Sequence, residues 1–396
     1  MNKLSLAKRL QGTDEYYFSK KLREIEVLNQ SGAQVINLGI GSPDLPPHPD
    51  VIATLAEQAA RPEVHGYQSY RGAKALREAI AAFYRQWYGV VLDPESEILP
   101  LIGSKEGIVH ISMTYLNEGD EVLVPDPGYP TYRAASQLAG AVCRTYALRE
   151  DQGWLPDFEA LSRIDLSRVK IMWLNYPHMP TGTLPTREFF EQCVDFASRH
   201  GILLCHDNPY SFILNDKPMS MLCVPGAKEV VLELNSLSKS ANMAGWRVGM
   251  LCGQAGRISE VLRFKSNMDS GMFLPVQLAA AKALSLPVSW YHSLNETYAR
   301  RREKIWALLR QLGCTWNPRQ AGLFVWARIP AGWPDGFAFS DAVLHQARVF
   351  ITPGGIFGQQ GKEYIRLSLC QPESVLEEAL QRIQLTHLQI PETTRV

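Results

Sequence analysis

Several features that mark specialised classes of protein are absent from this sequence of 396 residues. Its 40 lysines and arginines balance its 40 aspartates and glutamates, so there is no basic surplus for nucleic acid and no acidic arm. No stretch reaches about 18 uninterrupted apolar residues, the length that a helix needs to cross a bilayer. We therefore expect neither a nucleic-acid partner nor a membrane partner.

Cysteine is present but is not arranged in pairs. The seven cysteines lie far apart, and no two of them form a C-x-x-C motif. This spacing favours neither a structural zinc site nor a disulfide framework. The first residues also lack an apolar stretch of about 7 to 15 residues, which a secretory signal peptide would carry. We expect reduced thiols, no bound metal and a cytoplasmic location.

The alternation of predicted elements indicates an α/β protein. Apolar, β-rich runs alternate with helical periodicities over most of the chain, which is typical of a mainly parallel sheet covered on both faces. Seven strands are predicted, at 97–102, 121–124, 142–147, 169–174, 202–206, 230–234 and 248–252. Helices are predicted between them, near 73–87, 105–116, 129–138, 186–199 and 256–267.

The pattern changes after residue 287. A long charged helix reaches residue 312, and shorter strands follow near 323–327, 349–352 and 365–369. This predicts a second, smaller α+β domain, as the length of the chain also suggests. The expected division is 1–45 for an N-terminal arm and part of the small domain, 46–287 for the large domain and 288–396 for the small C-terminal domain.

The motif Ser236-Leu-Ser-Lys239 follows a predicted buried strand, and Arg247 comes soon after it. Burial lowers the pKa of an ammonium group, and an amine that titrates near neutrality can form a Schiff base with an aldehyde. The hydroxyls of Ser236 and Ser238 and the guanidinium of Arg247 suit a phosphate dianion. The spacing suits pyridoxal phosphate, although a polar loop at the end of a strand gives the same pattern.

Asp207 follows the strand predicted at 202–206. The carboxyl end of a buried parallel strand faces the crevice in which open α/β sheets bind ligands. An aspartate there can keep a pyridine nitrogen protonated, which makes the ring an electron sink. A helix N-cap or a turn is the alternative role for this residue.

Two further strand ends carry groups that suit a phosphorylated ring. The segment Gly103-Ser104-Lys105-Glu106 is a strand-to-helix junction whose first-turn amides attract an anion, and an ordinary capped helix start is the alternative. Tyr129 follows another predicted strand, where its ring can cover a planar cofactor. Core packing is the alternative role for Tyr129.

These four motifs, in this order, resemble those of the class I/II aminotransferases, which are fold-type I pyridoxal-phosphate enzymes. The similarity covers nearly the whole chain, and the resemblance implies a large domain with a seven-stranded, mainly parallel sheet and a smaller α+β domain. Matching segments also include Gly39-Ile-Gly41-Ser-Pro-Asp44, Tyr67-Gln-Ser-Tyr-Arg-Gly72, Asn175-Tyr-Pro-His-Met-Pro180-Thr-Gly182 and Tyr364-Ile-Arg366.

The resemblance implies a role for each matching residue. Lys239 would form the Schiff base and shuttle the proton, while Asp207 would pair with the pyridinium nitrogen. Tyr210 would donate a hydrogen bond to the ring phenolate oxygen, and Tyr129 would stack on the ring. The enzyme would move an amino group between an L-amino acid and a 2-oxo acid by a ping-pong mechanism. A β-eliminating or cyclising lyase on the same scaffold is the alternative.

The resemblance also implies how phosphate and substrate are held. The substrate α-carboxylate would bind Arg366 and the backbone at Gly41. Tyr67 and the loop 267–271 would reach the phosphate of a neighbouring subunit, so that a homodimer shares its active sites. The expected phosphate ligands within one subunit are Ser104, Lys105, Ser236, Ser238 and Arg247.

One departure from the family pattern concerns the cofactor. Relatives read N-N-P-T-G where this chain reads His178-Met179-Pro180-Thr181-Gly182, so Met179 replaces the asparagine that contacts the phenolate oxygen. Methionine cannot donate that hydrogen bond. Tyr210 alone, His178 or Asn175 can supply it instead, and the sequence leaves these alternatives open.

A second departure concerns the substrate. The segments Glu15-Tyr-Tyr-Phe18 and Leu38-Gly-Ile-Gly41 resemble the diaminopimelate-aminotransferase branch of the family. Those relatives carry an acidic residue in the loop after the subunit-crossing tyrosine, whereas this chain has Tyr70. Because an aromatic ring cannot pair with a distal ammonium as a carboxylate does, a broad-range or biosynthetic amino-acid transaminase is favoured.

Overall fold

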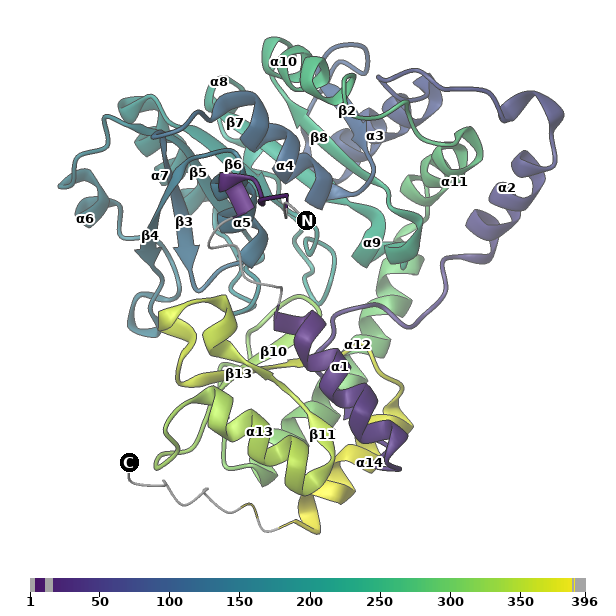
Figure 1. The fold of residues 1–396 in the computed structure, drawn as a ribbon. Helices are drawn as coiled ribbons and strands as arrows, with labels where there is room; N and C mark the ends of the chain where they lie inside the picture. The colour runs from purple at the N-terminus through teal and green to yellow at the C-terminus, as the bar shows by residue number, and fades with distance from the viewer. Residues whose placement is uncertain (1–3, 11–16, 387, 389–396) are drawn as a thin grey trace.

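The computed structural model describes residues 4–10, 17–386 and 388. Figure 1 shows two regions, a large sheet with its helices and a smaller sheet with helices of its own. The N-terminal helix α1 (Tyr17–Gln30) lies with the smaller region, beside the C-terminal helices. Among the described residues, no helix is long and apolar enough to span a membrane.

The large sheet has seven strands in the order β2-β8-β7-β6-β5-β3-β4. Only β8 runs antiparallel to its neighbours, so the prediction of a seven-stranded, mainly parallel sheet is confirmed. The strands are β2 (Ile98–Leu101), β3 (Glu121–Asp126), β4 (Val142–Ala147), β5 (Val169–Asn175), β6 (Leu203–Asp207), β7 (Val231–Ser236) and β8 (Gly249–Gly253).

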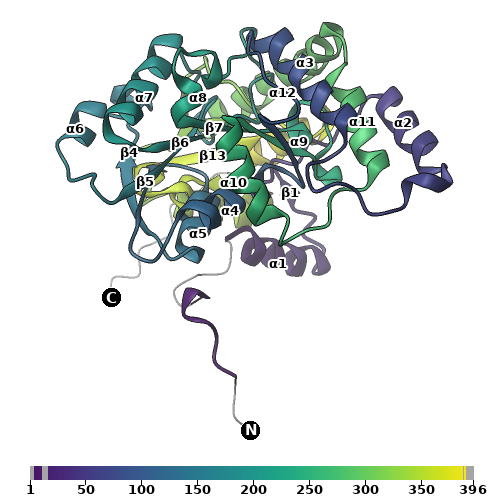
Figure 2. The same cartoon turned by 90° about the horizontal axis from the view of Figure 1, so that it is seen from above.

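Helices cover both faces of this sheet, as Figure 2 shows. Helices α4, α5 and α10 pack on one face through an apolar cluster that includes Ile108, Tyr132 and Trp173. A larger apolar cluster covers the other face and continues into the small region. The helices are α2 (Pro49–Ala59), α3 (Lys74–Tyr88), α4 (Ser104–Tyr115), α5 (Pro130–Leu138), α6 (Phe158–Ser162), α7 (Arg187–His200), α8 (Ala227–Val230), α9 (Leu237–Ser240), α10 (Ala255–Lys265) and α11 (Leu274–Leu284).

Local chemistry explains where the predicted helices begin and end. The Thr186 side chain accepts a hydrogen bond from the Phe189 amide and caps α7, which ends at Gly201 in the left-handed region. Helix α3 ends in the same way at Gly89. The predicted helices agree with α3, α4, α5, α7 and α10 to within about two residues, the usual uncertainty of helix ends.

The small region is built around the four-stranded sheet β12-β13-β10-β9. A two-stranded parallel sheet pairs β1 with β11, which joins residues 36–37 to the C-terminal part of the chain. These elements are β1 (Ile36–Asn37), α12 (Val288–Gln311), β9 (Thr315–Trp316), β10 (Phe324–Arg328), α13 (Gly336–Ala347), β11 (Val349–Phe350), β12 (Thr352–Pro353), β13 (Tyr364–Ser368) and α14 (Glu373–Gln384).

The single strand predicted at 349–352 is wrong, because the structure divides this segment into two strands. The segment 349–352 is divided into β11, which pairs with β1, and β12, which pairs with β13 in the other sheet. Between them the Ile351 carbonyl accepts a hydrogen bond from the Ser340 hydroxyl of α13 instead of a strand partner. Short 3-10 helices lie at Lys8–Leu10, Pro62–Val64, Glu150–Gln152, Met221–Cys223, Ala244–Trp246, Gly354–Phe357 and Gln359–Gly361.

All seven cysteines lie within the described residues, and all are free thiols, as expected. The boundaries at 45/46 and 287/288 stay a prediction.

Candidate active site

A cavity of about 550 Å³ lies where the strands of the large sheet meet the small region. All predicted site residues except Tyr67 line it, although they come from segments far apart in the sequence. Those lining residues are Gly41, Ser104, Lys105, Tyr129, Asp207, Tyr210, Ser236, Ser238, Lys239, Arg247 and Arg366. The carboxyl ends of β6 and β7 supply Asp207 and Ser236, as expected for an open α/β sheet.

Lys239 lies in the short helix α9, which follows directly after β7. Its Nζ donates a hydrogen bond to the Gly41 carbonyl at 2.6 Å, so the amine points toward the segment that contains Gly41. Burial lowers the pKa of Lys239, because an ammonium group loses hydration in the cavity. A larger fraction of this lysine is therefore the uncharged, nucleophilic amine than is usual for lysine.

Asp207 is the last residue of β6, and within the described part of the chain one of its two oxygens has no hydrogen-bond partner. The Tyr132 hydroxyl donates a hydrogen bond to Oδ2 at 2.9 Å. Oδ1 is buried and has no hydrogen-bond partner among the described residues. Burial raises the pKa of Asp207 to about 6, and the hydrogen bond from Tyr132 limits the rise. A buried acceptor of this kind needs a donor, and a protonated pyridine nitrogen supplies one.

The start of α4 and the end of β7 form a cup suited to phosphate. Gly103 has a φ of +84°, and a Cβ built on it would overlap the Arg247 guanidinium. Only glycine lets Arg247 lie so close to the first amides of α4. The Ser236 and Ser238 hydroxyls are 2.9 Å apart, and Arg247 Nη1 lies 3.5 Å from Ser238 Oγ. Together with Asp207, this cup fits pyridoxal phosphate.

Arg366 is buried on β13 and is held between aromatic rings. Its guanidinium carbon lies 3.8 Å from the ring centre of Phe324 and 4.8 Å from that of Phe357. Nη2 donates to the Gly39 carbonyl at 2.7 Å. The stacking fixes the plane of the guanidinium, which suits two-point binding of a carboxylate.

Three side chains near Met179 were predicted to supply the hydrogen bond that methionine cannot make, and the structure shows where each of them lies. Asn175 and Tyr210 line the cavity, whereas His178 is not among the described residues that line it. His178 Nδ1 instead lies 2.8 Å from the Thr181 hydroxyl, and burial lowers the pKa of His178 to about 3. Asn175 accepts from the Met179 amide at 2.8 Å and donates to the Asp207 carbonyl at 2.6 Å. Of the three predicted substitutes, Tyr210 and Asn175 are therefore the two that line the cavity.

Tyr67 is 94% exposed and is not among the described residues that line the cavity. Gly271 packs against the backbone carbonyls of Gln68 and Ser69, so the loop 267–271 and the Tyr67 segment lie side by side. An exposed phenol beside this loop is available to a second subunit. The role of Tyr67 stays a prediction.

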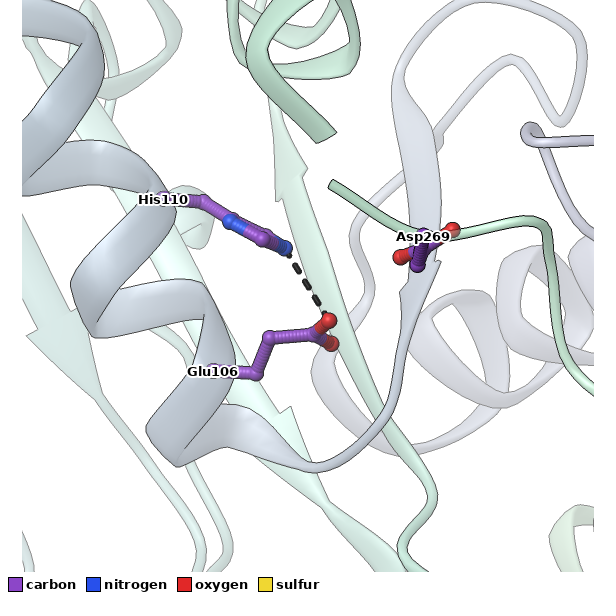
Figure 3. A group of neighbouring side chains, drawn as sticks. All are labelled: Glu106, His110 and Asp269. Atoms are coloured by element: carbon purple, nitrogen blue, oxygen red, sulfur yellow. Dashed lines mark ion pairs between the residues drawn. The ribbon is translucent and has the colours of Figure 1, made fainter. Parts of the chain in front are cut away.

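A cluster of ionisable side chains lies behind the phosphate cup. Figure 3 shows Glu106 and His110 extending from one helix toward Asp269 on a neighbouring loop. Glu106 accepts from the Ile102 amide at 2.6 Å, and its other oxygen lies 3.1 Å from His110 Nε2. The buried Lys265 ammonium pairs with Asp269 at 2.7 Å and neutralises it. The ligand atoms of Glu106, His110 and Asp269 lie within 4.8 Å of one another, so the cluster places the loop 267–271 next to α4.

The sequence interpretation missed several cavity residues. Tyr132 lies one helical turn after Tyr129 in α5, so helical spacing was the available signal. Its ring stacks on Trp173 at 5.1 Å, which fixes the hydroxyl against Asp207. Phe18 and Phe324 also line the cavity. The segment that ends at Phe18 was noted only for its resemblance to one branch of the family, and the sequence surroundings of Phe324 resemble those of an ordinary core residue.

Fold and site together define a fold-type I pyridoxal-phosphate enzyme. The chain belongs to the class I and II aminotransferases, since the model of that family matches residues 33–383. The protein is therefore an enzyme, a pyridoxal-phosphate-dependent aminotransferase, and the predicted fold class, cofactor and reaction class are confirmed.

Individual relatives agree with this assignment. The chain is 41% identical to the LL-diaminopimelate aminotransferase of Dehalococcoides mccartyi, with 96% of this chain and 98% of the relative covered. It is 42% identical to the protein of that name from Desulforudis audaxviator, with 96% and 97% covered. The solved structure of substrate-bound BacF from Bacillus subtilis has a TM-score of 0.91 at 38% identity, with 96% and 97% covered. The resemblance to the diaminopimelate-aminotransferase branch is thereby confirmed.

Proposed function

We propose that this aminotransferase acts on L-amino acids with apolar or aromatic side chains. The observation that carries the proposal is the wall beside Arg366, which consists of Phe18, Ile40, Met179 and Phe324. Among the described residues that line the cavity, Asp207 is the only carboxylate. A substrate with a distal ammonium thus finds no counterion here other than the group that faces the cofactor ring.

We assign the cofactor contacts as follows. When bound, pyridoxal phosphate supplies an aldehyde that condenses with amines and a ring that accepts an electron pair. Asp207 binds the ring nitrogen, Tyr210 the phenolate oxygen, and Tyr129 covers the ring face. Ser104, Lys105, Ser236, Ser238 and Arg247 bind the phosphate.

The chain's own residues orient the substrate and move the proton. Arg366 and the backbone at Gly41 bind the α-carboxylate and thereby fix the position of the Cα–H bond. Lys239 Nζ, whose pKa is lowered by burial, removes this proton and returns it to the cofactor side. The 2.6 Å hydrogen bond to the Gly41 carbonyl supports this role, because it holds Nζ beside the carboxylate site.

We further propose that the protein is cytoplasmic and that it forms a homodimer whose subunits share their active sites. Exposed Tyr67 and the adjoining loop 267–271 would complete the phosphate site of the partner. The seven free thiols are in keeping with a reducing compartment. Within each subunit we propose an N-terminal arm and part of the small domain at 1–45, a large domain at 46–287 and a small domain at 288–396.

LL-diaminopimelate is the second candidate amino donor. The names of curated relatives at about 40% identity favour it. Tyr70 and the apolar wall disfavour this donor, because neither carries a negative charge that could pair with a distal ammonium.

A competition experiment separates the two candidates. The purified enzyme is offered L-leucine, L-phenylalanine or LL-diaminopimelate at equal concentration, and kcat/KM is measured for each. We expect the apolar donors to be preferred by about tenfold or more, as burial of an apolar side chain of this size implies. A preference for LL-diaminopimelate would refute the proposed specificity.

A further inference from the structure

His206 precedes Asp207 on β6, and its ring is completely buried. Nδ1 lies 2.9 Å from Glu233 Oε2 on the neighbouring strand β7. Nε2 lies 3.0 Å from the Tyr176 carbonyl. Glu233 is also completely buried, so the two side chains form a pair shielded from water.

The hydrogen bonds around His206 and Glu233 determine the charge of each side chain. A carbonyl oxygen only accepts, so Nε2 of His206 must carry a proton. Glu233 accepts from the Tyr84 hydroxyl at 3.0 Å, the Ser220 hydroxyl at 2.8 Å and the Met221 amide at 2.9 Å. These three donors stabilise a carboxylate, which leaves the shared proton on Nδ1. His206 is therefore an imidazolium beside an ionised Glu233.

This cation lies directly behind Asp207. The register pairs His206 with Glu233 and Asp207 with Leu234, and side chains alternate along the strand. His206 thus points away from the cavity while Asp207 points toward Tyr132. The Asp207 backbone is held in place, because its carbonyl accepts from Asn175 at 2.6 Å.

A positive charge at this position favours the ionised form of Asp207, which burial disfavours. Burial raises the pKa of Asp207 to about 6, whereas the Tyr132 hydrogen bond and the positive charges of His206 and Lys239 lower it. Without His206 the carboxylate would be protonated over a larger part of the neutral range.

We propose that the His206–Glu233 pair is a positioning pair that keeps Asp207 ionised for the ring nitrogen of the cofactor. This inference rests on the proposed role of Asp207. The roles assigned to Lys239 and Arg366 do not depend on it. Neither His206 nor Glu233 lines the cavity in the described residues, so they act through Asp207 alone.

Other ionisable groups near the pair do not replace it. Tyr129, Tyr132, Tyr210 and Lys239 interact with Asp207. Burial raises the pKa of the three phenols, which keeps them uncharged, and it lowers the pKa of Lys239, which reduces the positive charge that this lysine supplies. The ionisable groups that face Glu233 are Tyr84, Tyr88, Cys223 and Cys252, and burial raises the pKa of each of them, which keeps them uncharged.

The test measures cofactor binding as a function of pH. The cofactor is removed, and the protein is titrated with pyridoxal 5′-phosphate between about pH 5 and about pH 8, where a carboxylate with a raised pKa titrates. A 1-deaza analogue, which lacks the ring nitrogen, is titrated in parallel. Protonation of the phosphate and of Lys239 weakens both ligands alike as the pH falls. In the wild type, affinity for pyridoxal 5′-phosphate should therefore fall more steeply than affinity for the analogue, and the difference should follow the Asp207 titration.

Glu233→Gln removes the counterion and with it the imidazolium charge. We expect the acid limb, the part of the pH profile in which affinity for pyridoxal 5′-phosphate falls, to shift to higher pH by about one unit. The double variant His206→Gln with Glu233→Gln is neutral at both positions and should show the same shift, so it serves if the single variant does not fold. Tyr84→Phe is the matched control, because it removes one hydrogen bond to Glu233 and leaves both charges. Its acid limb should not move.

The outcomes separate the two claims. An unshifted acid limb in every folded variant that lacks the charge pair overturns the inference, as does an equal shift in Tyr84→Phe. If the wild type binds the deaza analogue with the same pH dependence as pyridoxal 5′-phosphate, the proposed role of Asp207 itself is wrong.

Discussion

Met179 is the residue at which this site differs most from its family pattern. Its sulfur lies 3.4 Å from Arg366 Nη1, and its amide is held by Asn175. The thioether thus lies against Arg366 at the wall of the cavity without offering a donor. The absence of that donor has a consequence that spectroscopy can measure.

We predict that Met179→Asn lowers the pH midpoint of the absorbance change of the bound cofactor. The new amide would donate to the phenolate oxygen and stabilise the deprotonated form. A hydrogen bond to a charged group contributes about 1 to 3 kcal/mol, which corresponds to about 1 to 2 pH units. Met179→Leu is the control, since leucine fills similar space without a donor, and its midpoint should stay near that of the wild type. An unchanged midpoint in the asparagine variant, with full cofactor occupancy, would contradict the prediction, because it would mean that the contact missing at Met179 has already been replaced.

Helix α4 is the element whose placement matters most for the cofactor. Its first residue follows Gly103, and the close approach of Arg247 depends on the missing side chain there. Glu106 accepts a hydrogen bond from the Ile102 amide and thereby fixes the strand-to-helix turn.

We predict that Gly103→Ala weakens cofactor binding by about tenfold to a hundredfold, because Arg247 must move and lose the phosphate contact that we propose for it. The dissociation constant for pyridoxal 5′-phosphate measures this. Gly89→Ala is a matched control, since Gly89 also has a positive φ but has nothing within 4 Å of a built Cβ. It should lower the melting temperature through backbone strain and leave cofactor affinity unchanged. Equal affinity in both variants would contradict the proposed phosphate cup.

The sequence allowed prediction of those elements whose signals are local. Strands β5, β6 and β7, and the polar groups at the ends of β6 and β7, could be predicted because buried parallel strands are continuous apolar runs. The division of 349–352 between two sheets could not, because it depends on β1, more than three hundred residues earlier in the chain. The stacking of Arg366 on Phe324 is equally a product of tertiary packing.

At the scale of the whole molecule, the cavity of one chain lacks one of its predicted residues. Tyr67 is exposed beside the loop 267–271, while the other predicted residues line the cavity. This arrangement is what a site completed by a second subunit requires.

We predict that mixing Tyr67→Phe subunits with Lys239→Ala subunits restores activity. In a hybrid dimer, the site that keeps Lys239 receives Tyr67 from the other subunit, so one of two sites is intact. Random exchange of equal amounts should give about a quarter of wild-type activity plus the residual activity of the Tyr67→Phe parent. Absence of any gain, with subunit exchange verified by mass, would contradict shared active sites.

The most direct test of the account is a single-turnover product measurement on the holoenzyme. One equivalent of L-leucine or L-phenylalanine is added without an acceptor, and 2-oxo acid and ammonia are both quantified. We predict that one 2-oxo acid forms per converted cofactor and that no ammonia is released. The original absorbance should return when a second 2-oxo acid is added. Lys239→Ala should give no product, whereas Lys74→Ala, at an exposed lysine, should behave as the wild type. Release of ammonia, or product formation by Lys239→Ala, would contradict amino transfer through Lys239.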